Sequence, residues 1–103
     1  MKSPLQIPAK VRKQVIERDG GCCVICGRPT TDIHHIVNGG MGRRRCHHIA
    51  NLMLMCDFPY ENPCHKRVHE GKDSERLQRW TEARSRRMYG DVIDRIKKGE
   101  KLC

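Results

Sequence analysis

The sequence contains few aromatic residues and no long hydrophobic segment. One Phe, two Tyr and one Trp make up its aromatic content, and 37% of its 103 residues are hydrophobic. This length suits one small domain, which buries only about 60–65% of its unfolded surface. We therefore expect the fold to need stabilisation beyond its apolar core. Because no run of about 18 apolar residues exists, a transmembrane helix is excluded.

The N-terminal residues also lack the apolar stretch of a secretory signal, since they read MKSPLQIPAKVRKQVIERDG. We therefore expect a cytoplasmic protein with no membrane partner. In that reducing compartment, clustered Cys and His residues bind metals rather than form disulfides. Acidic residues are scarce too, with 12 Asp and Glu against 21 Lys and Arg. The resulting net charge of +9 favours a polyanionic partner.

Composition divides a single domain over residues 1–103 into three stretches. Residues 1–21 are expected to form an N-terminal helix, and residues 71–103 a basic helical tail. Residues 22–70 hold six of the seven Cys and all six His. We expect the chemistry of the protein to be concentrated in this middle stretch.

Helical periodicity marks the two outer stretches. After Pro8, apolar residues recur at helical spacing at Val11, Val15 and Ile16, and Asp19-Gly20 ends the pattern. In the tail, Ser74 can begin a helix that Gly90 ends. Its expected buried face is Leu77, Trp80, the stem of Arg84 and Met88, and a last short helix is expected around Val92, Ile93 and Ile96.

Four cysteines have the spacing of a structural zinc site. Cys23-x2-Cys26 is a typical half-site, and Cys56 and Cys64 can supply the second half. Four thiolates suit tetrahedral zinc, which would add folding free energy that the small core lacks. Cys22 can replace Cys23, although the two-residue spacer is commoner. The alternative for any of these cysteines is a buried small apolar residue, which is the expected role of Cys46 and Cys103.

The histidines suggest a second metal site. His65 and His69 are four residues apart, on one face of a helix. His34 and His35 lie in a β-branched segment that predicts a strand, so their side chains point to opposite faces. Three imidazoles can then bind one metal while a fourth acts as a base. Asp32 shares a face with His34 and can orient it, and phosphate contact or solvation is expected for His47 and His48, with a ligand role left open.

Together these residues resemble the HNH endonuclease family, the ββα-metal nucleases. The resemblance covers residues 11–70 and is carried by Val15-x2-Arg18-Asp19, Cys23-x2-Cys26, Asp32-Ile33-His34-His35-Ile36, Asn51-Leu52 and Cys64-His65-x3-His69. It implies an α+β fold with a small ββα-metal core, stabilised by structural zinc and flanked by N- and C-terminal helices. It also implies a DNA endonuclease from a bacterial or phage-infected cell that leaves 5′-phosphate and 3′-hydroxyl ends.

The resemblance implies a role for each site residue. His35 matches the general base that activates water, and Asn51 matches the residue that holds this base in place. His34, His65 and His69 match the ligands of one divalent cation, which can be Mg, Mn, Ni or Zn. Duplex DNA is the expected partner.

The family usually has two residues between the second pair of zinc ligands, whereas seven separate Cys56 from Cys64. We expect this insertion to lie away from the catalytic histidines. Phosphate contacts are expected from Arg43, Arg44 and Arg45, and the tail arginines Arg79, Arg84, Arg86 and Arg87 can extend them; a solvated charged surface is the alternative.

Three other classes of protein account for fewer of these residues. A non-catalytic zinc module that binds nucleic acid explains the charge and the cysteines, but does not need the four histidines with Asn51. A zinc-dependent deaminase requires His-x-Glu before Pro-Cys-x-x-Cys, and the order here is reversed. A two-Cys two-His finger needs about twelve residues before its first His, and only seven separate Cys26 from His34.

Overall fold

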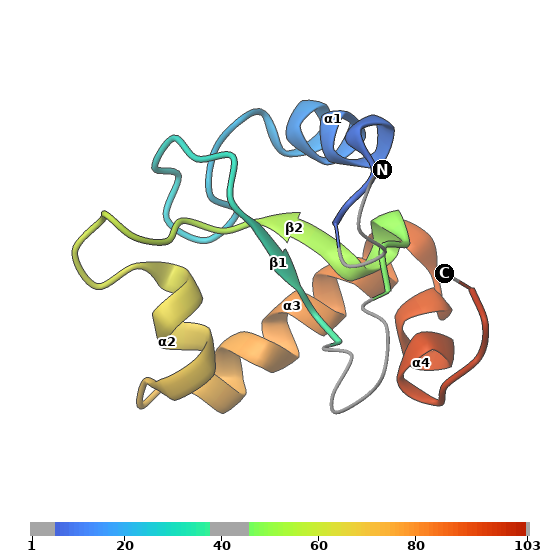
Figure 1. The fold of residues 1–103 in the computed structure, drawn as a ribbon. Helices are drawn as coiled ribbons and strands as arrows, with labels where there is room; N and C mark the ends of the chain where they lie inside the picture. Colours follow the sequence, from blue (N-terminus) through green and yellow to red (C-terminus); the bar gives the residue numbers. More distant parts are fainter. Residues whose placement is uncertain (1–5, 38–45, 103) are drawn as a thin grey trace.

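The computed structural model describes residues 6–37 and 46–102 (Figure 1). Within these residues, none of the helices is long and apolar enough to cross a lipid bilayer. The architecture is α+β, as expected from the sequence. Its elements are α1 (Ala9–Asp19), β1 (Ile33–His35), the 3-10 helix η1 (Ile49–Asn51), β2 (Leu52–Leu54), α2 (Cys64–Glu70), α3 (Ser74–Tyr89) and α4 (Val92–Lys97).

The sheet contains two short antiparallel strands, β1 and β2. His34 pairs with Met53, and His35 pairs with Leu52. Neighbouring residues of a strand point to opposite faces, so His34 and His35 are directed to different sides of the sheet. The connection between the strands runs from Ile36 to Asn51 and contains η1.

Strand β2 is buried on both faces. Leu52 and Leu54 pack with Val15 of α1 in one apolar cluster. Met53 belongs to a second cluster that contains Val68 of α2. In Figure 1, α1 lies on one side of the strands, and α2 and α3 lie on the other. The two clusters explain how so short a sheet fixes the helices around it.

Helix α1 has the bounds that the sequence predicts, from Pro8 as its N-cap to Gly20 as its C-cap. Gly20 has a φ of 70°, in the left-handed region that favours glycine. The helix ends in a buried polar contact, because Asp19 accepts hydrogen bonds from Arg18, from Arg84 of α3 (2.7 Å) and from the backbone N–H of Leu54 (2.9 Å). This contact joins α1, β2 and α3.

The buried face of α3 differs from the expected one. Leu77 is buried, but Trp80 and Met88 are 37% and 43% exposed, while Thr81 and Ser85 are buried instead. Ser85 Oγ donates a hydrogen bond to the Ala50 carbonyl oxygen at 2.6 Å. Small side chains therefore face η1, and the bulky ones are turned outward.

The end of the chain follows the sequence prediction. Gly90 is the C-cap of α3, and the backbone turns there into α4. Ile93 and Ile96 are buried. The expected short amphipathic helix is therefore confirmed.

Candidate functional site

Four cysteine sulfurs come together near the start of α2. One ligand atom from each of Cys23, Cys26, Cys56 and Cys64 lies within 4.8 Å of the others. Cys26 Sγ and Cys56 Sγ are 3.6 Å apart, close to the roughly 3.8 Å expected between two sulfurs bound to one tetrahedral zinc. The four cysteines can therefore bind one zinc ion. Cys22 lies outside the cluster and pairs with Pro29 in a β-bridge, so the two-residue spacer is the one used.

Local backbone geometry builds this cluster. Gly27 has a φ of 83°, and its N–H donates to the Cys23 carbonyl oxygen at 2.9 Å, which closes a tight turn. Cys64 is the first residue of α2, and its backbone N–H donates to Cys56 Sγ at 3.2 Å. The seven-residue spacer thus bends back far enough to bring its two ends together.

Arg28 places a positive charge against the thiol cluster. Its guanidinium donates to Cys26 Sγ and to Cys56 Sγ, each at 3.2 Å. Burial raises the pKa of the Cys26 thiol, but the hydrogen bond from Arg28 and further contacts outweigh it and lower this pKa to about 6. Burial and thiol neighbours raise the pKa of Cys64 to about 12. Arg28 would offset part of the negative charge of four thiolates around one divalent ion.

Three imidazoles form a second cluster from β1 and α2. Ligand atoms of His34, His65 and His69 lie within 4.8 Å of one another. His65 Nε2 and His69 Nε2 are 3.2 Å apart, close to the roughly 3.3 Å expected for two nitrogens on one tetrahedral metal. The three side chains can therefore hold one metal ion.

His34 is prepared for such a ligand role. Its Nδ1 atom is buried and has no hydrogen-bond partner among the described residues, which is unusual for a buried polar atom. Burial, followed by the nearby His65 and His69 rings, lowers the pKa of His34 to about 3. His34 is therefore neutral near pH 7, and a neutral imidazole is the form that binds a metal.

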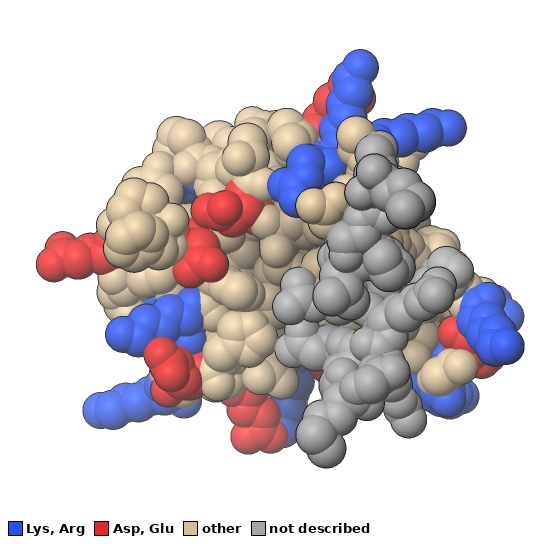
Figure 2. Space-filling model, in the orientation of Figure 1, with Lys and Arg blue, Asp and Glu red and all other residues tan. Residues whose placement is uncertain are grey.

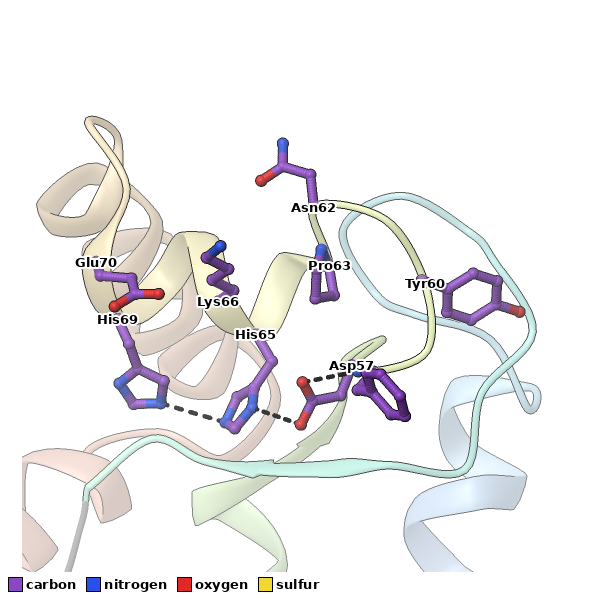
Figure 3. Close-up of a pocket in the computed structure, with 9 residues that line it drawn as sticks. Asp57, Tyr60, Asn62, Pro63, His65, Lys66, His69 and Glu70 are labelled. Atoms are coloured by element: carbon purple, nitrogen blue, oxygen red, sulfur yellow. Dashed lines mark hydrogen bonds and ion pairs between the residues drawn. The ribbon is translucent and has the colours of Figure 1, made fainter.

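The spacer between Cys56 and Cys64 was expected to lie away from the histidines, but its residue Asp57 contacts one of them. Its Oδ2 is 3.0 Å from His65 Nδ1, and its Oδ1 accepts the Phe58 N–H at 2.9 Å (Figure 3). A proton on Nδ1 of His65 leaves Nε2 free toward His69.

The orienting role expected of Asp32 is not supported. Asp32 is exposed, and its carboxylate accepts a hydrogen bond from Thr30 at 3.2 Å. Among the described residues it makes no hydrogen bond to His34. The carboxylate that contacts a cluster histidine is that of Asp57 instead.

His35 lies next to the cluster in sequence but faces other residues. Its Nε2 is 3.2 Å from His47 Nδ1. The Nε2 atom of His47 is buried, and within residues 6–37 and 46–102 it has no hydrogen-bond partner. His48 accepts the Ala50 N–H at 3.0 Å and caps η1. His47 and His48 are both half-buried, and the phosphate contact or solvation expected for them stays a prediction.

Asn51 is fully buried at the end of η1. Its Oδ1 accepts the Val37 N–H at 2.7 Å, and its Nδ2 donates to the carbonyl oxygens of Val37 (3.1 Å) and Cys46 (2.9 Å). Asn51 therefore joins two chain positions on either side of residues 38–45. The role that the resemblance implies for Asn51, holding the general base in place, stays a prediction.

Several expected basic contacts are paired within the protein or lie outside the described residues. Arg84 binds Asp19, Arg86 binds Asp94, and Arg79 binds Glu75. Arg43, Arg44, Arg45 and Cys103 lie outside the described residues. Cys46 is buried as expected, but it is disulfide-bonded, contrary to the expectation of packing alone.

Two side chains beside the clusters, Arg28 and Asp57, were not identified from the sequence. Arg28 and Asp57 each lie within two residues of a cluster cysteine, and that proximity is the signal that could have found them. The sequence gives no comparable signal for the contact between His35 and His47, because the two residues are 12 positions apart. Comparisons with family models, with curated proteins and with solved structures return no match, so this site is interpreted from its own geometry.

Proposed function

We propose that the protein is a metal-dependent DNA endonuclease of the HNH type. The observation that supports this most is the cluster of His34, His65 and His69, which join a strand to the helix that follows it. A fourth histidine, His35, is adjacent to His34 on the same strand. Two residues after it, the backbone N–H of Val37 donates a hydrogen bond to Asn51. Strand, loop and helix therefore contribute in the order that the family resemblance implies.

The histidine cluster would hold one divalent cation. When bound, such a cation neutralises charge on a phosphodiester and stabilises the departing oxygen. The chain contributes neutral ligands, with His34 kept unprotonated by burial and His65 oriented by Asp57. Imidazole ligands suit Ni and Zn, whereas Mg and Mn prefer oxygen ligands and would need phosphate and water oxygens to complete their coordination.

His35 would act as the general base. A neutral imidazole can take a proton from water. The contact between His35 Nε2 and His47 Nδ1 fixes the orientation of the ring. Asn51 holds the backbone that leads away from His35 through its two hydrogen bonds to Val37.

The four cysteines would bind a structural zinc ion. Their site is mostly buried, and it fastens the Cys23–Cys26 turn to the start of α2. Such a site would provide folding free energy in a domain with a small apolar core.

DNA is the proposed partner. The net charge of +9 supports a polyanionic ligand. On the described part of the face in Figure 2, Lys and Arg side chains are spread around the edge rather than gathered in one patch. Because Arg79, Arg84 and Arg86 are paired with acidic residues, the proposed phosphate contacts rest on Arg43, Arg44 and Arg45 rather than on the tail.

Cleavage of supercoiled plasmid in the presence of Mg²⁺, Mn²⁺, Ni²⁺ or Zn²⁺ tests the proposal. We expect cleavage with at least one cation, and a loss of about 10²–10⁴-fold in rate for His35→Ala. His48→Asn is the matched control, because it also removes a histidine but keeps a side chain that can cap η1. It should cleave at the wild-type rate.

Mild chelation provides the second arm of this test. EDTA should abolish cleavage while the protein stays folded, and Mg²⁺ or Mn²⁺ should restore it without refolding. His65→Ala and His69→Ala should resist this rescue. If no cation produces cleavage while salt-dependent DNA binding persists, the nuclease proposal is wrong. The chain would then be better described as a zinc-stabilised module that binds nucleic acid without cutting it.

A further inference from the structure

A cavity of about 520 Å³ opens between α2 and the loop that joins Cys56 to Cys64. Two of the side chains that line it, His65 and His69, belong to the histidine cluster, and Figure 3 shows Lys66 and Glu70 beside them along the same helix. The cavity lies within the range of roughly 300–1,000 Å³ that is typical of ligand pockets. A ligand held here would therefore lie directly beside the proposed cation.

Phe58 is the most exposed large hydrophobic residue among those that the structure describes. Its side chain lines this cavity and is 86% exposed, compared with 43% for Met88 and 37% for Trp80. A single exposed apolar side chain needs no special explanation. An aromatic ring at the rim of a cavity that also contains two metal-ligand candidates is a different case, because its free face is available to a ligand there.

The loop that carries Phe58 is held by contacts on both sides of it. Asp57 accepts the Phe58 N–H, and the Tyr60 hydroxyl donates to the Pro29 carbonyl oxygen at 2.7 Å. Arg28 lies over the Tyr60 ring at 4.7 Å and donates to the Glu61 carbonyl oxygen at 3.2 Å. The phenyl ring is thus presented on a fixed backbone, which lowers the entropy lost when a ligand binds to it.

We propose that this cavity is a subsite for an unpaired nucleobase of the DNA strand, with Phe58 as its stacking platform. The inference rests on the proposed function only in taking nucleic acid as the ligand. Aromatic side chains bind successive bases of single strands by stacking, with little regard to sequence. A base in a duplex would have to leave its stack to reach the ring, so the subsite favours single-stranded or unpaired DNA.

The charges that line the cavity favour a base over a phosphate at this position. Away from the proposed cation, Lys66 is the positive side chain that lines the cavity, and the carboxylates of Asp57 and Glu70 would repel a phosphate there. A neutral base avoids that repulsion. The side-chain amide of Asn62, at the loop end of the cavity in Figure 3, offers both a donor and an acceptor to a base edge.

Fluorescence anisotropy with two single strands of equal charge tests the proposal. One is a fluorescein-labelled ten-nucleotide oligothymidylate, and the other is a fully abasic strand of the same length. The protein is used in mild EDTA, which should empty the histidine cluster but leave the four-thiolate zinc in place, so that the strands are not cut. Phe58→Ala should weaken binding of the oligothymidylate by roughly 5- to 150-fold and leave binding of the abasic strand unchanged.

Two further variants make the result specific to stacking. Phe58→Trp should restore binding of the oligothymidylate, because indole also offers a face to a base. Met88→Ala removes another exposed apolar side chain far along the sequence and should change neither affinity. Since Phe58 is exposed, its variants should keep the wild-type circular dichroism spectrum.

Equal affinity of wild type and Phe58→Ala for the oligothymidylate would overturn the proposal, as would an equal loss for both strands. The outcome does not depend on cleavage. A base-dependent effect of Phe58 in a protein that never cuts plasmid supports the subsite and contradicts the nuclease. Plasmid cleavage with no base-dependent effect of Phe58 supports the nuclease and contradicts the subsite.

Discussion

Removing the Asp57 carboxylate should weaken cation binding at the histidine cluster. Asp57 Oδ2 holds His65 Nδ1 at 3.0 Å, and loss of a carboxylate behind a ligating histidine typically costs about 10–100-fold in metal affinity. The two side chains are 42% and 32% exposed, so solvent weakens their interaction. We therefore expect the lower end of this range for Asp57→Ala, about 10-fold or about 1.4 kcal/mol.

The affinity can be read from the EPR signal of free Mn²⁺ during titration of the zinc-loaded protein, without any substrate. Asp57→Asn keeps an oxygen that can accept the Phe58 N–H, so it isolates the effect of the charge. Asp32→Ala is the matched control, since it removes an equal charge whose carboxylate contacts Thr30 instead. If Asp57→Ala and Asp32→Ala bind Mn²⁺ equally well, Asp57 does not position His65.

Two further predictions concern stability. Cys26→Ser should lose one equivalent of zinc by elemental analysis and melt at a clearly lower temperature. If the zinc content and the melting temperature are unchanged, the cysteines only pack in the core and do not bind zinc. Asp19→Ala should lower the free energy of unfolding in urea by about 3–5 kcal/mol, because it leaves Arg18 and Arg84 without their buried partner. Burial opposes ionisation of Asp19, but hydrogen bonds from Arg18, Leu54 and Arg84 lower its pKa below 3.8. The stabilisation by Asp19 should therefore be present at neutral pH and disappear as the pH falls through this lowered pKa. If acid lowers the free energy of unfolding of Asp19→Ala as much as that of the wild type, this role of Asp19 is contradicted.

Features set by local spacing could be predicted from the sequence. Pro8 and Gly20 mark the two ends of α1, because each favours a backbone conformation found at a helix end. The two-residue spacer of Cys23 and Cys26 and the four-residue separation of His65 and His69 likewise describe geometry within one element. Cys23 and Cys26 come together with Cys56 and Cys64, and His65 and His69 come together with His34. These longer-range contacts were expected from the order of the residues rather than from their spacing.

Features set by tertiary contact could not be predicted in this way. The apolar pattern of α3 pointed to Trp80 and Met88, but close approach to η1 favours the small Ser85 and turns the larger side chains outward. The length of the spacer does not show that Asp57 returns to His65, and only its position beside Cys56 could have pointed to it. The pairing of tail arginines with Asp19 and Asp94 depends on side chains far apart in sequence, which composition alone does not reveal.

Helix α2 begins with a residue of one cluster and continues with residues of the other. Cys64 belongs to the thiol cluster, and the next residue, His65, belongs to the imidazole cluster. A metal that fixes the position of Cys64 therefore also restricts His65, so occupation of one site lowers the entropy lost on filling the other. By thermodynamic linkage the effect is reciprocal. The two sites would then behave as one cooperative unit, in which zinc sets the affinity for the second cation as well as the stability of the fold.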